Sequence, residues 1–267
     1  MRAAVVTLSL TLAACGLAQA RPLPPDAPFA TIDEAVEFLA TAEVVEREEL
    51  PMGINRPDRM RLRAGEVEAR AVFRTVYDHR DVGTWGFVDS YLSELAAFEL
   101  ARLLGYDAIP PTVLRRAGKR GSLQLWIEGA MTEAERLEKG IEPPPEQAEH
   151  FHRQRQMADL FDQLIANTDR HMGNFLVTPD WTLWLVDHTR SFDGRRELRD
   201  PDTVQRVERR VWERLLTVSD QEIRQRVKPY VKGTHVASLL ERRRRVVALV
   251  KERIAAEGED AVVFAAP

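Results

Sequence analysis

Two stretches of the sequence decide the fold, DQLIANTDRHMGNFLV at residues 162–177 and WLVDHTRSF at residues 184–192. Both place polar side chains where a loop meets a short apolar strand. The first offers Asp169 and, five residues later, Asn174, and the second places Asp187 directly after its strand. Carboxylate and amide oxygens suit Mg²⁺ or Mn²⁺ better than Zn²⁺. The pattern therefore predicts metal-assisted phosphoryl transfer, in which one Asp orients or deprotonates an acceptor hydroxyl while the other Asp and the Asn hold the metal.

A predicted helix precedes these stretches. Residues 89–104 carry Leu and Ala on a helical period, and Gly105 follows as a C-cap. The segment at residues 93–111, SELAAFELARLLGYDAIPP, together with the D-R-H-x-x-N loop and the strand that ends in Asp, resembles the atypical kinases. These include the secreted kinases of the animal Golgi, the spore-coat kinases, the HipA-type bacterial kinases and the phosphoinositide kinases. The resemblance covers roughly residues 43–192 and extends to a group of exported bacterial proteins.

The resemblance implies an α+β, bilobal protein-kinase-like fold. A small N-terminal sheet lobe with one helix would occupy residues 43–128, and a larger helical lobe would occupy residues 129–256. The nucleotide would lie between the lobes. The implied reaction transfers the ATP γ-phosphoryl group to a hydroxyl acceptor, with Mg²⁺ or Mn²⁺ as the metal. The acceptor would be a protein, a lipid or a small molecule.

The resemblance also assigns roles within the two opening stretches. Asp169 matches the catalytic Asp of these kinases, Asn174 a metal ligand and Asp187 the main metal-binding Asp. The sequence D-H-T replaces the D-F-G of ordinary protein kinases. We expect His188 and Arg170 to have structural, hydrogen-bonding roles rather than to act as a metal ligand or a base.

The strand lysine of the kinase pattern is missing. In these families a Glu on the helix, here Glu94, pairs with a strand Lys that holds the nucleotide phosphates, but residues 71–74 read AVFR. No Lys precedes Lys119, so a shifted register does not supply one. Arg74 keeps the charge on a larger, planar and bidentate head. We expect Arg74 to bridge Glu94 and a phosphate.

Two further residues of the N-terminal lobe are candidates for contact with the nucleotide. No multi-glycine phosphate loop precedes Arg74, and Gly53, between the first two predicted strands, is the one candidate for that loop. Trp126 falls where a kinase has its last N-lobe strand and hinge. This position allows either a contact with adenine or a place in the core.

Three other interpretations stay open at this stage. The missing Lys favours a catalytically inactive pseudokinase or binding module. Kinase-like folds can also bind the nucleotide in reverse, which would transfer AMP instead of phosphate. A metal-dependent phosphohydrolase would use a constellation of Asp169, His171, Asp187 and His188.

Composition limits the other possibilities. The chain has 267 residues, of which 44% are hydrophobic and 30% charged, so it is long and apolar enough to bury a core and is not largely disordered. The formal net charge is −4 and gives no reason to expect a nucleic-acid partner. A single Cys excludes a disulfide scaffold and a Cys-based zinc site. The run Arg242–Arg245 predicts a solvated helix face.

The first 20 residues are typical of an export signal. Arg2 precedes an uncharged, mostly apolar run at residues 3–14, which is too short to span a membrane. Leu-Ala-Ala-Cys ending at Cys15 resembles a bacterial lipobox, which would place a lipid anchor on Cys15, whereas Ala-Gln-Ala at 18–20 is typical of an ordinary signal-peptidase site. We expect an exported protein that is periplasmic, membrane-anchored or secreted.

The remaining segments follow from local patterns. Residues 21–42 predict a Pro-rich linker and a short helix, and residues 257–267 a tail. Predicted strands lie at residues 43–50, 58–64, 67–77, 112–116, 122–128, 174–177 and 183–187. Predicted helices lie at residues 146–166 and within residues 200–256.

Overall fold

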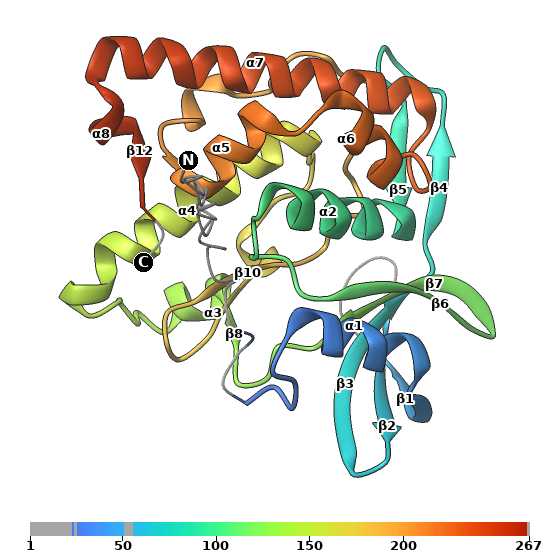
Figure 1. Cartoon of the computed structure of the whole chain (residues 1–267). Helices are drawn as coiled ribbons and strands as arrows, with labels where there is room; N and C mark the ends of the chain where they lie inside the picture. Colours follow the sequence, from blue (N-terminus) through green and yellow to red (C-terminus); the bar gives the residue numbers. More distant parts are fainter. Residues whose placement is uncertain (1–22, 24–25, 51–55, 266–267) are drawn as a thin grey trace, which may run out of the picture.

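The chain forms two lobes, one built on a sheet and one built mainly on helices (Figure 1). The computed structural model describes Leu23, residues 26–50 and residues 56–265. Two separate hydrophobic clusters form the cores of the two lobes. The expected α+β, bilobal class is therefore confirmed. Cys15, the expected export signal at 1–20 and Gly53 lie outside the described residues.

The elements follow one another in a simple order. The sheet lobe contains α1 (Ile32–Thr41), β1 (Glu43–Glu49), β2 (Asp58–Ala64), β3 (Val67–Arg74), β6 (Thr112–Ala117) and β7 (Lys119–Leu125). Between β3 and β6 come β4 (Tyr77–Arg80), β5 (Phe87–Ser90) and α2 (Tyr91–Leu104). The helical lobe contains β8 (Met131–Thr132), α3 (Glu133–Glu138), α4 (Pro145–Ile165), β9 (Phe175–Val177), β10 (Leu183–Leu185), β11 (Val207–Glu208), α5 (Arg209–Thr217), α6 (Asp220–Val227), α7 (Gly233–Glu257), α8 (Glu259–Val262) and β12 (Val263–Phe264).

The main sheet places Arg74 on the face away from its core. Its five strands run in the order β1-β2-β3-β7-β6, and every neighbouring pair is antiparallel. Ala71 and Phe73 are buried and lie opposite Leu125 and Leu123 of β7. Because successive side chains of a strand point to opposite faces, Arg74 points away from this core.

A glycine lets β7 pass close to the end of β3. A Cβ atom at Gly121 would overlap the backbone carbonyl oxygen of Arg74 and would lie 2.7 Å from Cε2 of Phe73, closer than real Cβ contacts allow. Gly121 is therefore required where the two strands meet next to Arg74.

The helix that packs on this core is α1 rather than α2. Ala35, Phe38 and Leu39 of α1 join the core of the sheet lobe. The sequence analysis predicted this short helix but began the sheet lobe at residue 43, whereas the apolar face of the helix packs on the sheet. The N-cap Thr31 accepts a hydrogen bond from the Glu34 backbone N–H, as the capping pattern predicts.

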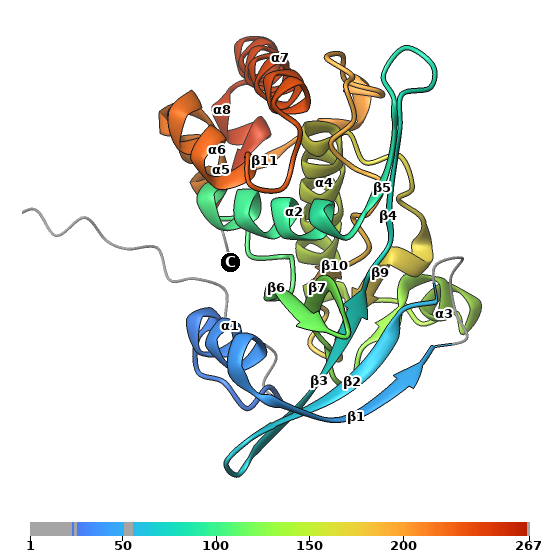
Figure 2. The same ribbon diagram turned by 90° about the vertical axis from the view of Figure 1, so that its right-hand side faces the viewer.

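Helix α2 lies between the sheet and the upper helices (Figure 2). The Ser90 side chain caps its N-terminus, and Gly105 ends it in the left-handed conformation with φ of 69°. Phe98, Leu100 and most other apolar side chains of α2 join the core of the helical lobe. Helix α2 therefore contributes Glu94 to the boundary between the two cores.

Three segments differ from the expectations. The predicted strand at 67–77 ends at Arg74, and the next residues form the hairpin β4–β5. Helix α3 was not predicted; it is short and begins with a capping box. The expected tail at 257–267 contains α8 and β12, and β12 pairs with β11 in parallel and is buried. The other predicted elements are present, with ends that shift by a few residues.

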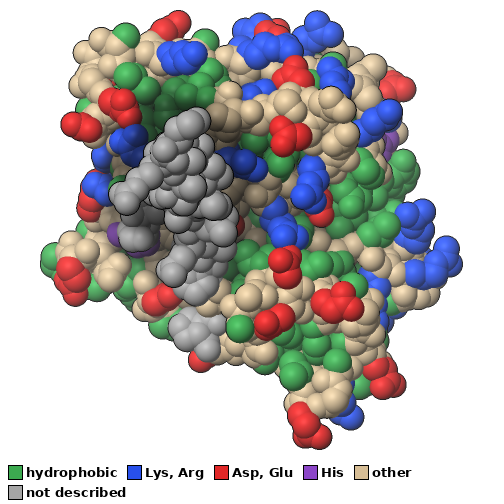
Figure 3. All heavy atoms as spheres, in the orientation of Figure 1, with side chains coloured by type: hydrophobic (Ala, Val, Ile, Leu, Met, Phe, Trp, Pro, Cys, Tyr) green, Lys and Arg blue, Asp and Glu red, His purple; other side chains and the backbone are tan. Residues whose placement is uncertain are grey.

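The arginine run on α7 is not a uniform solvated face. Arg242 is fully buried and donates from Nε to the Leu164 carbonyl at 2.8 Å. Arg243 and Arg244 both pair with Asp220. On the face that Figure 3 displays, basic and acidic side chains are interleaved. No described helix is both long and apolar enough to cross a membrane.

Candidate active site

Arg170 clamps the two loops that carry the candidate residues. Its Nε and Nη2 donate to the two oxygens of Asp162, at the end of α4, at 2.8 and 3.0 Å. Its Nη1 donates to the carbonyls of Asn174 and Val186 at 2.9 and 2.7 Å. Four donor contacts from one guanidinium therefore hold the segments before β9 and after β10 together. The expected structural role of Arg170 is confirmed.

The turn after α4 is fixed by a second set of contacts. Ala166 ends the helix in the left-handed conformation. Asn167 donates from Nδ2 to Asp162 at 2.9 Å, and its Oδ1 accepts from the backbone N–H of Asp169 at 3.0 Å. Asn167 therefore links the backbone of Asp169 to the same buried carboxylate, Asp162, that accepts from Arg170.

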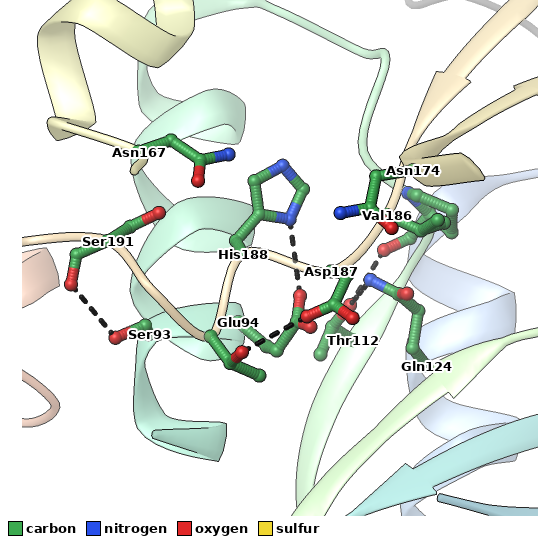
Figure 4. A network of polar contacts seen from close by, with 12 residues as sticks. Ser93, Glu94, Thr112, Gln124, Asn167, Asn174, Val186, Asp187, His188 and Ser191 are labelled. Carbon is green, nitrogen blue, oxygen red and sulfur yellow. Dashed lines mark hydrogen bonds and ion pairs between the residues drawn. The ribbon is translucent and has the colours of Figure 1, made fainter. Parts of the chain in front are cut away.

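Asn174 and Asp187 lie on adjacent segments (Figure 4). The backbone N–H of Val186 donates to the Asn174 carbonyl at 3.1 Å, which brings the start of β9 next to the end of β10. The buried Asn174 side chain donates from Nδ2 to the Asp169 carbonyl at 3.0 Å. Its amide oxygen is therefore the atom left for a ligand. Asp187 has a left-handed φ of 59°, and Thr189 donates to its Oδ1 at 3.1 Å.

Asp169 is half-exposed and contacts a residue that the sequence analysis did not single out. Nη1 of Arg190 lies 3.2 Å from Asp169 Oδ2, and its Nε lies 3.3 Å from Oδ2 of Asp89. The Arg190 carbonyl also accepts from the backbone of Thr168 at 3.0 Å. Arg190 lies within the stretch at 184–192, but its partners are distant in sequence, so local pattern carried no signal of this bridge.

A cavity of about 390 Å³ lies beside this bridge. Its walls come from the end of the hairpin β4–β5 and from the segment after Asp187. Thr168 and Arg190, which flank and contact Asp169, are among its lining residues, as are Trp85 and Arg195. The backbone N–H of Gly194 donates to the Trp85 carbonyl at 2.9 Å and ties the hairpin to this segment.

Glu94 joins the end of β3 to the segment that carries Asp187. Its Oε1 lies 3.6 Å from Nε of Arg74, and its Oε2 lies 3.2 Å from Nδ1 of His188. Glu94 and His188 are fully buried, and 12% of the Arg74 side chain is exposed. The structure therefore brings the expected helix acid and strand cation together. His188 turns toward Glu94, in line with its expected structural role (Figure 4).

Glu94 is ionised despite its burial. Desolvation is the largest influence and raises its pKa, but the charge of Arg74 and the hydrogen bond from His188 together outweigh it. The pKa of Glu94 is lowered from 4.5 to about 2. A carboxylate at this position attracts the guanidinium across the boundary between the cores.

Trp126 follows β7 and is half-buried between two arginines. The guanidinium carbons of Arg59 and Arg70 lie 5.9 and 5.3 Å from the centroid of its ring. Arg70 is itself held by Glu128. The structure thus accounts for the Trp126 ring by cation–π packing within the sheet lobe.

The two histidines of the phosphohydrolase alternative have other partners in the structure. His171 is exposed, and its Nδ1 accepts a hydrogen bond from the backbone of Gly173 at 3.1 Å. His188 is bonded to Glu94 instead of facing Asp187. Within the described part of the chain, no group of three or more His, Cys, Asp and Glu side chains is arranged to hold a metal ion.

The fold is similar to those of two solved kinase-like proteins. The structure of hydra Fam20 with sugar matches with a TM-score of 0.65 and 17% identity, over 92% of this chain and 95% of that chain. The Golgi casein kinase matches with a TM-score of 0.61 and 16% identity, over 87% of this chain and 79% of that chain. The Golgi casein kinase with Mn/ADP bound matches with a TM-score of 0.61 and 15% identity, over 87% of this chain and 78% of that chain.

These likenesses show the fold alone. No family model and no curated protein matches the sequence. The chain therefore has the two-lobed architecture of these structures, at an identity too low to carry over their activities.

Proposed function

We propose that the protein is a metal-dependent phosphotransferase of the atypical kinase type, which transfers the ATP γ-phosphoryl group to a hydroxyl acceptor. The observation that carries the proposal is the joint placement of Asp169, Asn174 and Asp187 on one hydrogen-bonded loop system. The Arg74–Glu94 pair is attached to this system through a further hydrogen bond. The site would thus combine a carboxylate for the acceptor, two oxygen ligands for a metal and a cation for the phosphates.

Asn174 and Asp187 would hold Mg²⁺ or Mn²⁺. The amide nitrogen of Asn174 is committed to the Asp169 carbonyl, so the side chain offers its oxygen. With the Asp187 carboxylate this gives the hard oxygen donors that suit these cations, which take further ligands from phosphates and water. A bound metal would neutralise charge on the phosphates. The similar Golgi casein kinase was solved with Mn/ADP bound, which supports this choice of ligands.

Arg74 would position the phosphates. Its Nη1 is buried and has no hydrogen-bond partner within the described part of the chain. Buried donors are normally satisfied, and a phosphate oxygen is a strong acceptor for a guanidinium. A nucleotide bound between the lobes would supply that acceptor, and Glu94 would hold the guanidinium through the ion pair between Oε1 and Nε.

Asp169 would orient or deprotonate the acceptor hydroxyl. Its carboxylate is 44% exposed, so an incoming hydroxyl can reach it, while Arg190 restrains one of its oxygens. The neighbouring cavity gives an acceptor a place to bind. Catalysis would then consist mainly of positioning and charge neutralisation.

The decisive experiment incubates the protein with γ-labelled and α-labelled ATP, Mg²⁺ or Mn²⁺, and generic protein, lipid and sugar acceptors. The wild type is expected to transfer γ-label, and Asp187→Ala is expected to transfer none. Asp202→Ala is a matched control, because Asp202 is an exposed Asp on a surface turn. Transfer of α-label would identify an AMP transferase, and metal-dependent ATP binding without transfer a pseudokinase. Equal transfer by the wild type and Asp187→Ala would contradict the site.

Export is a separate proposal that rests on residues 1–20. We infer that the protein leaves the bacterial cytoplasm and carries a lipid on Cys15. Expressed as the full chain in a bacterium, the wild type is expected to incorporate labelled fatty acid, and Cys15→Ser is expected not to. Processing after Ala20 without lipid would show ordinary signal cleavage instead.

A further inference from the structure

Glu94 divides its two oxygens between two partners from different parts of the fold. Arg74 at the end of β3 approaches Oε1, and His188 after β10 approaches Oε2. We propose that His188 is a positioning residue, which occupies Oε2 so that Arg74 keeps its terminal guanidinium nitrogens available for the nucleotide phosphates. This inference rests on the proposed function, because it concerns the same site.

The hydrogen bond to Glu94 determines which nitrogen of the His188 ring is the donor and how the ring is oriented. An ionised carboxylate only accepts hydrogen bonds, so Nδ1 of His188 must carry the hydrogen and donate to Glu94. Nε2 is buried and has no hydrogen-bond partner among the residues that the structure covers. The edge of the ring packs on Phe161 at a centroid distance of 6.5 Å and an angle of 88°. The bond to Glu94 is therefore the polar contact that orients the ring.

His188 changes how Arg74 can meet Glu94. An arginine and a carboxylate alone favour a fork in which two N–H groups meet both oxygens. Here Oε2 is taken, and Nε of Arg74 lies 3.6 Å from Oε1, an ion-pair contact in which Oε1 accepts no hydrogen bond from the described residues. Nη1 remains without a hydrogen-bond partner among the described residues. A lysine presents one compact charge to both glutamate and phosphate, whereas the larger arginine head needs one edge for each.

The backbone that follows His188 is bonded to the start of α2. Asp187, the proposed metal ligand, precedes it, and the carbonyl of Thr189 accepts from the backbone N–H of Ser90 at 2.9 Å. The hydroxyl of Ser93 donates to the Ser191 carbonyl at 3.2 Å (Figure 4). The segment is thus bonded to the first turn of α2 at several points. Removing the imidazole donor should change the position of Arg74 without detaching the segment that holds the metal ligand.

Three substitutions of His188 separate these effects. His188→Phe keeps an aromatic ring and removes the donor. His188→Asn places an amide nitrogen near the position of Nδ1, and His188→Gln is a matched control whose longer amide reaches the position of Nε2 instead. We expect His188→Phe and His188→Gln to lower kcat about 10- to 100-fold, as for other residues that orient a catalytic group. His188→Asn is expected to stay close to the wild type in kcat. The metal concentration for half-maximal transfer is expected to stay unchanged in all three, because the segment that follows Asp187 remains bonded to the start of α2.

The controls distinguish a structural role and a failure of the proposed function. Circular dichroism and Tm show whether each variant folds, and a purely structural role would lower Tm equally in His188→Phe and His188→Asn without separating their kcat values. A wild-type kcat for His188→Phe, or equal kcat values for His188→Phe and His188→Asn, overturns this inference alone. A wild type that neither transfers phosphate nor binds MnATP overturns the proposed function. If the wild type binds MnATP without transferring phosphate, the variants are compared by their Kd for MnATP. His188→Phe and His188→Gln are then expected to bind more weakly than the wild type and His188→Asn.

Discussion

Replacing Arg170 by Met should strongly destabilise the helical lobe. The Arg170 and Asp162 side chains are 10% and 9% exposed, and they make two hydrogen bonds to each other. Arg170→Met leaves Asp162 as a buried charge with Asn167 as its remaining side-chain donor. Breaking one side of such a pair costs about 3–5 kcal/mol. A whole domain is stable by about 5–15 kcal/mol, so the loss is a large fraction of the total.

A second substitution tests whether the buried charge is the cause. Asp162→Asn removes that charge with nearly the same shape, so the double variant of Asp162→Asn and Arg170→Met should be more stable than Arg170→Met alone. Urea unfolding at pH 7, followed by circular dichroism and tryptophan fluorescence, measures both changes. Arg244→Met is the control, since Arg244 is 58% exposed and its surface pairs should contribute little. A loss below about 1 kcal/mol for Arg170→Met, or no recovery in the double variant, would refute the reasoning.

Three further outcomes are expected. Because the pKa of Glu94 is lowered to about 2, its ionised form stabilises the fold above about pH 5, and the wild type should lose about 3 kcal/mol more than Glu94→Gln in urea unfolding as pH falls from 5 to 2. Gly121→Ala should cost about 1–3 kcal/mol in the same assay through its clash with the Arg74 carbonyl and the Phe73 ring, whereas Gly233→Ala, which meets open space, should not destabilise the fold. Asn174→Ala should raise the Mn²⁺ concentration for half-maximal transfer at least about 10-fold.

Local pattern predicted the elements that depend on neighbours in sequence. The apolar period and capping residues of α2, and the alternation in β2 and β3, act over a few residues, so these elements were predicted with small errors at their ends. The placement of Asp169, Asn174 and Asp187 where loops meet strands β9 and β10 follows from the same local signals. The structure adds the hydrogen bonds that join these three residues.

Local sequence patterns did not predict contacts between segments that are distant in the sequence. From the sequence, helix α1 was predicted as a short helix outside the sheet lobe, whereas in the structure its residues Phe38 and Leu39 lie in the core of that lobe. Arg242 looks like one member of a solvated run until α7 packs against α4 and buries it. In each case the residue type allows both environments, and packing with a distant segment decides between them.

The sequence by itself determined the two-lobed class, the oxygen-rich loop motif and the absence of a strand lysine before Lys119. The tertiary structure alone decided how an arginine is accommodated in the place of that lysine. Glu94 and His188 are 94 residues apart, and no periodicity relates them. They meet because α2 packs against the segment after β10. Inside this boundary a buried carboxylate requires compensation of its charge, and the fold supplies an ion pair with Arg74 and a hydrogen bond with His188.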